Sequence, residues 1–386
     1  MMGSHQELNV PVYLDYNATT PVAPEVVAAM APYWMERFHN PSASYPEAVT
    51  VRMAVDAARS DLATLLCTVP DAIVFTSGGT ESDNWALRAG LAYWQGERRR
   101  ILISAIEHPA VAETAQALRA AGAEVLSIPV DEHGVIRLDA LDAALNHQVA
   151  LVSVMCANNE IGTIQPVAQV ARRAHAVGAL VHIDAAQAVG KIPLDVQALD
   201  VDLLTVAGHK LYAPKGIGVL FIRPGLNLPP LLTGGGQEFG FRSGTENTPL
   251  VVGLGMAARL AKTWLDGEGP NRQAQLRDGL ENRLLADLPD CRIFGRERDR
   301  LPNTLAFAVP GWTGAHLLAA CPNLRAGTGS ACHHAEDAGA PTLRSMGVAS
   351  KLARGLVRIS LGRETTLANI EAAADALIQA ARTQEF

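Results

Sequence analysis

The sequence predicts an α/β fold in which a large domain with a mainly parallel sheet is joined to a smaller α+β domain. Short apolar segments alternate with helix-like segments between residues 71 and 222. Most of these apolar segments show no polar alternation, which is typical of strands buried on both faces. The chain has 386 residues, and we expect two domains because one hydrophobic core rarely serves more than ~250–300 residues.

Seven segments of this region have the length and the β-branched content of strands. They are residues 73–75, 101–104, 125–128, 151–155, 181–183, 203–206 and 219–222. Helix-like segments at 81–94, 110–121 and 167–177 separate several of them. Strand–helix–strand repetition predicts parallel strands with helices on both faces of the sheet. Only a loop separates the last two strands, which allows one antiparallel strand at an edge.

The pattern changes after Pro249, where two helix-like segments (272–288 and 367–381) flank strands at 304–309 and 356–361. We therefore assign residues 18–262 to the large domain, and residues 1–17 together with 263–386 to the small one. The Gly- and Pro-rich residues 226–244 are interpreted as a long functional loop within the large domain.

The composition of the chain argues against several classes of function. The net charge of −7 argues against a nucleic-acid or anionic-membrane partner, since both need clustered Lys and Arg. No apolar segment reaches the ~18–20 residues of a membrane span. The five cysteines lack the spacing of a disulfide framework, which favours a reducing compartment and predicts a cytoplasmic protein.

Lys210 is the first candidate catalytic residue, because Ala207-Gly208-His209-Lys210 directly follows a buried strand. Partial burial favours the neutral amine that forms imines. A strand-end lysine by itself is more often an exposed side chain, so this hypothesis depends on the motifs around it.

Asp184 is the second candidate, since it ends the buried strand 181–183, where open α/β sheets bind ligands. A carboxylate at that place can keep the pyridine nitrogen of a pyridoxal ring protonated. Gln187 could then contact the phenolic oxygen of the ring. A helix N-cap is the alternative role for this aspartate.

Three further polar motifs follow predicted strands. The first, Gly79-Thr80, opens a helix and can bind a phosphate through backbone N–H groups. The second contains His108 and the third Asn159; a histidine can stack on a ring, and an asparagine can bind a phenolic oxygen or a carboxylate. Each motif alone is more often turn chemistry. Because carboxyl ends of parallel strands share one edge, we expect the motifs to meet in one crevice.

Cys332 lies in a segment of small residues, 326–331, and is followed by His333 and His334. Small residues before a cysteine indicate a thiol that moves toward a substrate, and a neighbouring histidine favours the thiolate. A buried structural cysteine is the alternative. We expect no metal site, because consecutive residues seldom aim at one ion.

In combination, these motifs resemble the cysteine desulfurases of the NifS and IscS type and the related selenocysteine lyases. The resemblance runs from Tyr13-Leu14-Asp15-Tyr16-Asn17 to Arg358-Ile359-Ser360-Leu361-Gly362-Arg363, nearly the whole chain. It implies the aminotransferase class V group of pyridoxal-phosphate (PLP) enzymes, the PLP-dependent transferase fold type I with a seven-stranded sheet, and a homodimer.

The resemblance also implies a role for each matching residue. Lys210 would hold pyridoxal phosphate as a Schiff base and remove the substrate Cα proton, Asp184 would face the pyridine nitrogen, and His108 would stack on the ring. Cys332 would attack the sulfur of L-cysteine and become a persulfide for an acceptor protein, leaving alanine. The remaining contacts would come from Asn159 and Gln187 (phenolic oxygen), from Gly79, Thr80, His209 and, across the dimer, Thr245 (phosphate), and from Arg358 with Asn159 (substrate).

Some residues depart from the desulfurase pattern. Ala207 stands where the family often has serine, so Thr205 would have to supply the missing phosphate hydroxyl. His333 after the cysteine is similar to selenocysteine lyases, whereas Pro109 after His108 differs from the animal ones. A lyase that releases selenide from L-selenocysteine therefore stays an alternative.

Proteins of other classes explain less of the sequence. An aminotransferase on the same fold would account for Lys210 and Asp184 but gives Cys332 no role. A degenerate scaffold predicts loss of the lysine or the cysteine, and both are present. A DNA-binding regulator would need an added basic helix-turn-helix segment, for which the chain has no room.

Overall fold

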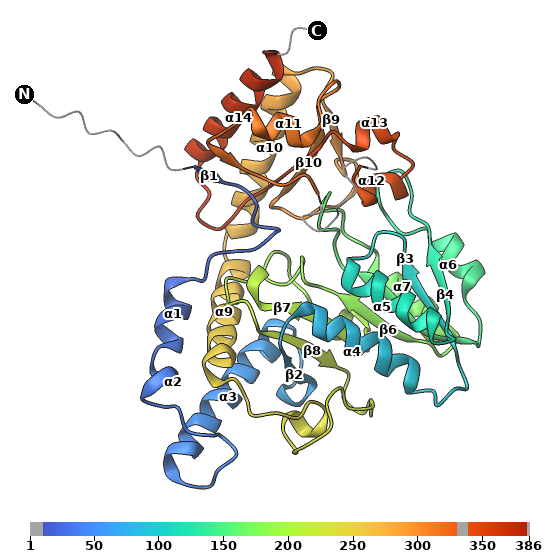
Figure 1. Ribbon diagram of the computed structural model, residues 1–386, viewed down its shortest axis with the longest axis vertical. Helices are drawn as coiled ribbons and strands as arrows, with labels where there is room; N and C mark the ends of the chain where they lie inside the picture. The colour runs from blue at the N-terminus through green and yellow to red at the C-terminus, as the bar shows by residue number, and fades with distance from the viewer. Residues whose placement is uncertain (1–10, 330–338, 384–386) are drawn as a thin grey trace, which may run out of the picture.

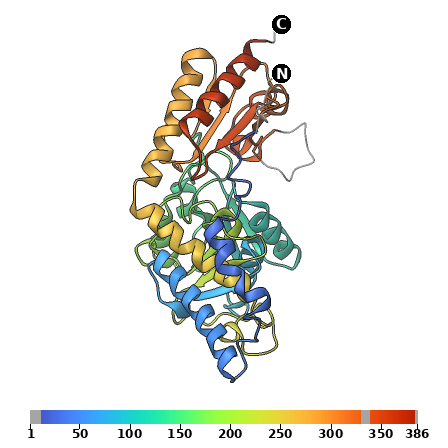
Figure 2. The same cartoon turned by 90° about the vertical axis from the view of Figure 1, so that its left-hand side faces the viewer.

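The computed structural model describes residues 11–329 and 339–383. A large sheet with its helices lies in the lower half of the view, and a smaller group of helices and strands lies above it (Figure 1). The turned view shows α9 (Thr248–Asp266) and α10 (Gly269–Asp287) following one another along one side of both parts (Figure 2).

The large sheet has seven strands in the order β2-β8-β7-β6-β5-β3-β4. Their bounds are β2 Ile73–Thr76, β3 Arg100–Ser104, β4 Glu124–Ile128, β5 Val149–Met155, β6 Leu180–Asp184, β7 Leu203–Ala207 and β8 Gly218–Ile222. The strands from β7 to β4 are parallel neighbours. Every residue of β5, β6, β7 and β8 is buried. The predicted α/β fold with a seven-stranded, mainly parallel sheet is thus confirmed.

One expected detail of the sheet is wrong. The strand β8 is antiparallel to β7, as the short connection suggested, but it does not form the edge of the sheet, because β2 pairs with it on the outside. Two antiparallel steps restore the original direction, so β2 ends at the same edge as β7 and its parallel neighbours. The pairing brings the segment after Thr76 next to the segment after Ala207 through their shared partner Gly218.

Helices cover both faces of this sheet. Side chains of α3, α7 and α9 pack on one face and belong to one hydrophobic cluster, whereas α4 and α5 pack on the opposite face. The helices of this part are α1 Pro24–Met30, α2 Pro32–Met35, α3 Pro46–Leu65, α4 Gly79–Ala92, α5 Pro109–Ala120, α6 Leu138–Ala144, α7 Val167–Ala176, α8 Val196–Leu199 and α9, with 3-10 turns η1 Pro70–Ala72, η2 Gly208–Lys210 and η3 Glu238–Gly240.

The smaller part contains a three-stranded antiparallel sheet, β12-β10-β9, and a short parallel pair of β1 with β11. Its elements are β1 Val12–Tyr13, α10, β9 Arg292–Phe294, β10 Thr304–Ala308, α11 Gly314–Ala319, β11 Leu324–Arg325, α12 Pro341–Ser345, α13 Ser350–Ala353, β12 Leu356–Ser360 and α14 Leu367–Arg382. Most of these elements share a second hydrophobic cluster with Leu14, whereas α12 and α13 belong to a third cluster that also contains Ile106 and Ile161 of the large part. A second cluster of this kind is expected for a two-domain chain. The domain boundaries given above remain a prediction.

The Gly- and Pro-rich segment 226–244 is anchored to the large part by a buried ion pair. Arg59 of α3 holds Glu238 at 2.7 Å, and the same carboxylate accepts the N–H of Phe75 at 2.7 Å. The segment is irregular except for η3, and none of its residues lines the large cavity described next. Its predicted functional role therefore stays a prediction.

Candidate active site

A cavity of about 460 Å³ lies at the carboxyl ends of β2, β3, β5, β6 and β7, and it brings together nine of the predicted residues. Each reaches it from a segment that follows or ends a strand, except Arg358, which lies within β12. The nine are Gly79, Thr80, His108, Asn159, Asp184, Gln187, His209, Lys210 and Arg358. The motifs therefore converge in one crevice, as the parallel arrangement of the strands required.

Lys210 enters the cavity from η2, the turn directly after β7. Its Nζ donates to the main-chain oxygens of Asn17 and Ala18, the latter at 2.6 Å. The preceding His209 contacts the hydroxyl of Thr19 through Nδ1 at 3.1 Å. Burial lowers the pKa of His209 to about 4, and the Lys210 charge acts in the same direction, so His209 is a neutral hydrogen-bonding group at neutral pH.

Asp184 ends β6 and is 6% exposed. Burial raises the pKa of its carboxyl above the ordinary value, while the nearby positive charges of His108 and Lys210 act in the opposite direction. Its Oδ1 accepts the N–H of Ala186 at 2.9 Å. A buried carboxyl in this setting gains most from a cationic partner, because an opposite charge offsets the cost of burying the carboxylate.

Gly79 and Thr80 begin α4, a helix of 14 residues whose N-terminus lines the cavity. The first N–H groups of a helix have no intrahelical acceptor, and the helix dipole favours an anion there. Glycine allows a close approach at position 79, since a Cβ would lie 3.3 Å from the Cβ of Ala207 on β7. The close contact holds this helix end beside the segment that carries Lys210.

Hydrogen bonds orient the side chains of His108 and Gln187. The Nδ1 of His108 accepts the N–H of Ala110 at 3.1 Å and caps α5, so a neutral His108 carries its proton on Nε2. Gln187 is 7% exposed and donates from Nε2 to the main-chain oxygen of Asn17 at 3.0 Å. Both side chains line the cavity along with Asn159.

Arg358 is 4% exposed and is held by three contacts. Its Nη1 donates to the main-chain oxygens of Asn159 and Gly329, each at 3.0 Å, and its Nη2 forms an ion pair with Asp15 at 2.6 Å. Its Nε is buried without a hydrogen-bond partner among the described residues. The guanidinium therefore keeps an unused donor in the wall of the cavity.

Three predicted residues are not among those that line the cavity: Thr205 and Thr245 lie elsewhere, and Cys332 is outside the described residues. Thr205 is fully buried within β7, its hydroxyl contacts Nε2 of His182 at 3.0 Å, and it does not line the cavity. Thr245 is exposed between η3 and α9. Cys332, with His333 and His334, lies outside the described residues; Gly329 and Pro341, on either side of that part of the chain, both line the cavity.

Sequence reasoning assigned no role to several acidic side chains in the cavity wall, and two of them, Asp83 and Glu107, interact with Asp184. Asp83 lies on α4 and is 2% exposed, and burial followed by the nearby Asp184 raises its pKa well above the ordinary value. Burial raises the pKa of Glu107 to about 8. One carboxyl oxygen of each is buried without a hydrogen-bond partner among the described residues. Asp83 could have been found, because it follows Thr80 by three positions and so shares its helix face.

The fold is shared with known proteins. The model of the aminotransferase class-V family matches residues 12–373, and the chain belongs to this family. A cysteine desulfurase of Trichormus azollae is 43% identical over 362 residues, which cover 93% of this chain and 90% of that protein. Among solved structures, a NifS-like protein has a TM-score of 0.89 at 34% identity, covering 96% of this chain and 99% of its own. SspA in complex with cysteine has a TM-score of 0.81 at 32% identity, covering 92% and 99%.

Neither a membrane span nor a metal site is found in the described part of the chain. Among residues 11–329 and 339–383, no helix has the length and apolar content to cross a membrane. Within the same ranges, no group of three or more His, Cys, Asp and Glu side chains is arranged to hold a metal ion.

Proposed function

We propose that this protein is a pyridoxal-phosphate-dependent cysteine desulfurase, which converts L-cysteine to L-alanine and keeps the sulfur as a persulfide on Cys332. The observation that carries the proposal is the single cavity lined by Lys210, Asp184, His108 and Arg358. The family supports it, since class-V aminotransferases imply this cofactor, and so do the relatives that are cysteine desulfurases.

The residues of the cavity fit pyridoxal phosphate. Asp184 needs a cationic partner, which a protonated pyridine nitrogen would be. The N-terminus of α4 offers N–H groups and the Thr80 hydroxyl to a phosphate, and His209 adds a neutral donor. When bound, the cofactor supplies an electron sink that stabilises the negative charge left on the substrate carbon after proton loss.

The roles of the chain's own residues follow from their positions. Lys210 would hold the cofactor, and its amine would take the Cα proton of the substrate. The unused Nε of Arg358 would donate to the substrate carboxylate, a contact that suits the planar guanidinium. His108, which lines the cavity, would donate its Nε2 proton to a leaving or developing group.

The thiol step belongs to Cys332. It lies three residues beyond Gly329, which lines the cavity, and three residues span at most ~10 Å. The Cys332 thiolate would attack the substrate sulfur, so that one C–S bond breaks and one S–S bond forms. The substrate carbon takes a proton in place of the sulfur and leaves as alanine, and the persulfide passes its outer sulfur to an acceptor thiol.

The selenocysteine lyase alternative is not favoured. The Trichormus azollae relative is a cysteine desulfurase, and the solved relative SspA was determined with cysteine. The similarity of His333 to selenocysteine lyases is one position against a match over 93% of the chain. The degenerate scaffold is disfavoured too, because the predicted cofactor lysine lies inside the cavity.

The protein would act as a homodimer. Large apolar side chains are exposed on α1, on α2, on the connection after α2 and on α3, and exposed apolar patches mark contact surfaces. They are Val27, Trp34, Met35, Phe38, Tyr45 and Met53, with Met35 83% and Phe38 68% exposed. A second copy of the chain is the occupant that the family resemblance implies, and Thr245 would reach the partner's phosphate site.

A cytoplasmic location remains part of the proposal. The four cysteines of the described residues, Cys67, Cys156, Cys291 and Cys321, are free thiols. A thiol that cycles through a persulfide also needs reducing surroundings, because an oxidising compartment would trap it as a disulfide.

The test is turnover of L-cysteine by the purified protein loaded with pyridoxal phosphate, with a dithiol present to release sulfide. We expect alanine and sulfide in equal amounts, and no alanine from Cys332→Ala. The control Cys67→Ala removes an exposed thiol away from the cavity and should turn over cysteine like the parent. Absence of alanine from the parent protein would refute the proposal.

The cofactor assignment has its own measurement. Lys210→Ala should lose the visible absorption band of the lysine-bound cofactor, whatever its activity. Turnover of L-selenocysteine measured in parallel separates the chalcogens: a Cys332→Ala variant that still releases selenide identifies this thiol as an acceptor of sulfur only.

A further inference from the structure

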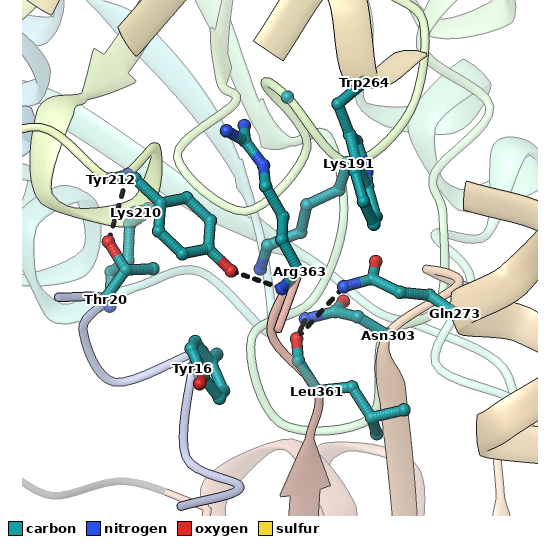
Figure 3. A pocket seen from close by; sticks show the side chains of 11 residues that line it. Tyr16, Thr20, Lys191, Lys210, Tyr212, Trp264, Gln273, Asn303, Leu361 and Arg363 are labelled. Atoms are coloured by element: carbon teal, nitrogen blue, oxygen red, sulfur yellow. Dashed lines mark hydrogen bonds between the residues drawn. The ribbon is translucent and has the colours of Figure 1, made fainter. Parts of the chain in front are cut away.

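A second lysine lies behind Lys210 and has no part in the function proposed above. Lys191 is 8% exposed and lines a small cavity with Lys210, Tyr212, Asn303 and Arg363 (Figure 3). The cavity measures about 10 Å³, which is room for about one water molecule. Buried lysines are rare unless they are paired, so this side chain needs a physical account.

The partners of Lys191 are two amide oxygens. Its Nζ donates to Oε1 of Gln187 and to Oδ1 of Asn17, both at 2.7 Å. Within residues 11–329 and 339–383 it forms no ion pair, because these two contacts are its only polar partners there. Burial, followed by the charges of Lys210 and Arg358, lowers its pKa well below the ordinary value.

The amides of Gln187 and Asn17, which Lys191 contacts, also line the large cavity of the candidate active site. Asn17 is 1% exposed; its Oδ1 also accepts Nδ2 of Asn303 at 3.0 Å, and its own Nδ2 donates to the hydroxyl of Thr304 at 2.9 Å. Its main-chain oxygen accepts from both Gln187 and Lys210. One hydrogen-bonded chain thus joins the second lysine to the first.

Lys191 and the main-chain oxygen of Asn17 together set which end of the Gln187 amide meets the large cavity. An ammonium offers only donors, and even a neutral amine has two N–H groups for these two oxygens. With Oε1 turned to Lys191 and one Nε2 hydrogen given to Asn17, the second Nε2 hydrogen is left for the cavity. Without Lys191, the orientation of the amide would depend, among the described residues, on the Nε2 contact with the main-chain oxygen of Asn17, an oxygen that Lys210 also uses.

We propose that Lys191 is a positioning residue that fixes the amides of Gln187 and Asn17, so that Gln187 presents an N–H donor to the phenolic oxygen of the cofactor. The inference rests on the proposed function. It concerns hydrogen-bond direction and not charge, and therefore holds for both protonation states of the lysine.

The experiment measures the pH at which the visible band of the lysine-bound cofactor changes between its two forms. A donor to the phenolic oxygen weakens that oxygen's hold on the proton shared with the lysine nitrogen, so losing the donor raises the midpoint. We expect Lys191→Met, which keeps the length but has no donor, to raise it by about 0.5 to 1 pH unit. Gln187→Met should raise it by a similar amount.

A double variant separates positioning from general damage. If Lys191 acts through Gln187, Lys191→Met combined with Gln187→Met moves the midpoint no further than Gln187→Met alone. A structural role alone would lower thermal stability and leave the midpoint unmoved, and independent roles would add. Lys262→Met on α9 removes a surface lysine paired with Asp266 and serves as the matched control.

Each outcome decides the inference. An unmoved midpoint in Lys191→Met, or shifts that add in the double variant, overturns it. If Lys191→Met does not fold, Lys191→Leu is measured with the same two outcomes. If the parent protein shows no visible band that Lys210→Ala removes, both the proposed function and the role of Lys191 are refuted. If the parent shows the band but its midpoint is the same in Lys191→Met, only the role of Lys191 is refuted.

Discussion

Replacing Gly79 by alanine adds one methyl group where α4 meets β7. The new Cβ would lie 3.3 Å from the Cβ of Ala207 and 3.7 Å from Cγ2 of Thr205. The first distance is shorter than ordinary carbon–carbon contacts, so the helix end must move away from the strand by a few tenths of an ångström. Because the two neighbours are short side chains on a buried strand, they cannot turn aside.

Two opposing contributions set the size of the effect. Overpacking in a well-packed core costs about 1–3 kcal/mol, while alanine is a better helix residue than glycine by about 0.5–1 kcal/mol. We therefore expect a modest net loss of stability. Cofactor binding should suffer more, because displacing the N–H groups at the helix end removes about one hydrogen bond to a charged group. Such a bond contributes about 1.5–3 kcal/mol, which is a roughly 10- to 100-fold weaker affinity for pyridoxal phosphate.

The assay titrates the cofactor-free protein with pyridoxal phosphate and follows the visible band, alongside thermal unfolding. The chain offers a matched control in Gly279 of α10, which is exposed and has no atom within 4 Å of the place that a Cβ would take. Gly279→Ala should raise the unfolding midpoint by about 1 °C and leave the cofactor affinity unchanged. If Gly79→Ala binds the cofactor as tightly as the parent, the close contact with β7 does not position the phosphate site.

Two further predictions concern pH and assembly. Burial raises the pKa of Glu107 to about 8 from 4.5, so the folded protein keeps this proton while the unfolded chain loses it, and stability falls as pH rises between about 4.5 and 8. Glu107→Gln cannot ionise, so it lacks this loss of stability. In the cofactor-free proteins, the unfolding midpoint temperature of the variant minus that of the parent should therefore increase from pH 5 to pH 8. A difference that does not change with pH would contradict this. Trp34→Glu with Phe38→Glu places two charges among the exposed apolar side chains of α2 and its connection; light scattering should then report a monomer where the parent is a dimer, and an unchanged mass would refute that surface as the interface.

The sequence predicted the edge of the sheet on which the site lies but not the full order of strands. Asp184 and Lys210 could be located because buried apolar runs identify β6 and β7, and parallel strands end at one edge. The place of β2 could not be predicted, since its pairing with β8 joins residues about 145 positions apart in the chain and no local pattern encodes that contact. This pairing is what brings Gly79 beside Ala207.

Side-chain direction and depth explain the other differences. Thr205 is paired with Asp184 across β6 and β7, but its hydroxyl contacts the side chain of His182. The cavity wall is formed mainly by residues at or beyond the strand ends. Arg358 lies inside β12 and not at a strand end, so only the family resemblance could identify it. Lys191 follows Gly190 in an irregular turn, where no periodicity predicts which way a side chain points.

The electrostatics of the cavity explain why Asp184, among the three carboxyls Asp83, Glu107 and Asp184 that influence one another, is the one suited to a cationic ring. Asp83, Glu107 and Asp184 all have raised pKa values, and burial is the largest cause in each. Asp184 further raises the pKa values of the other two, whereas His108 and Lys210 lower its own. A negative charge in this group is therefore held most easily on Asp184, with Asp83 and Glu107 kept protonated beside it. Adding a pyridinium nitrogen would strengthen that distribution, because the new positive charge meets the one carboxylate that the protein already favours.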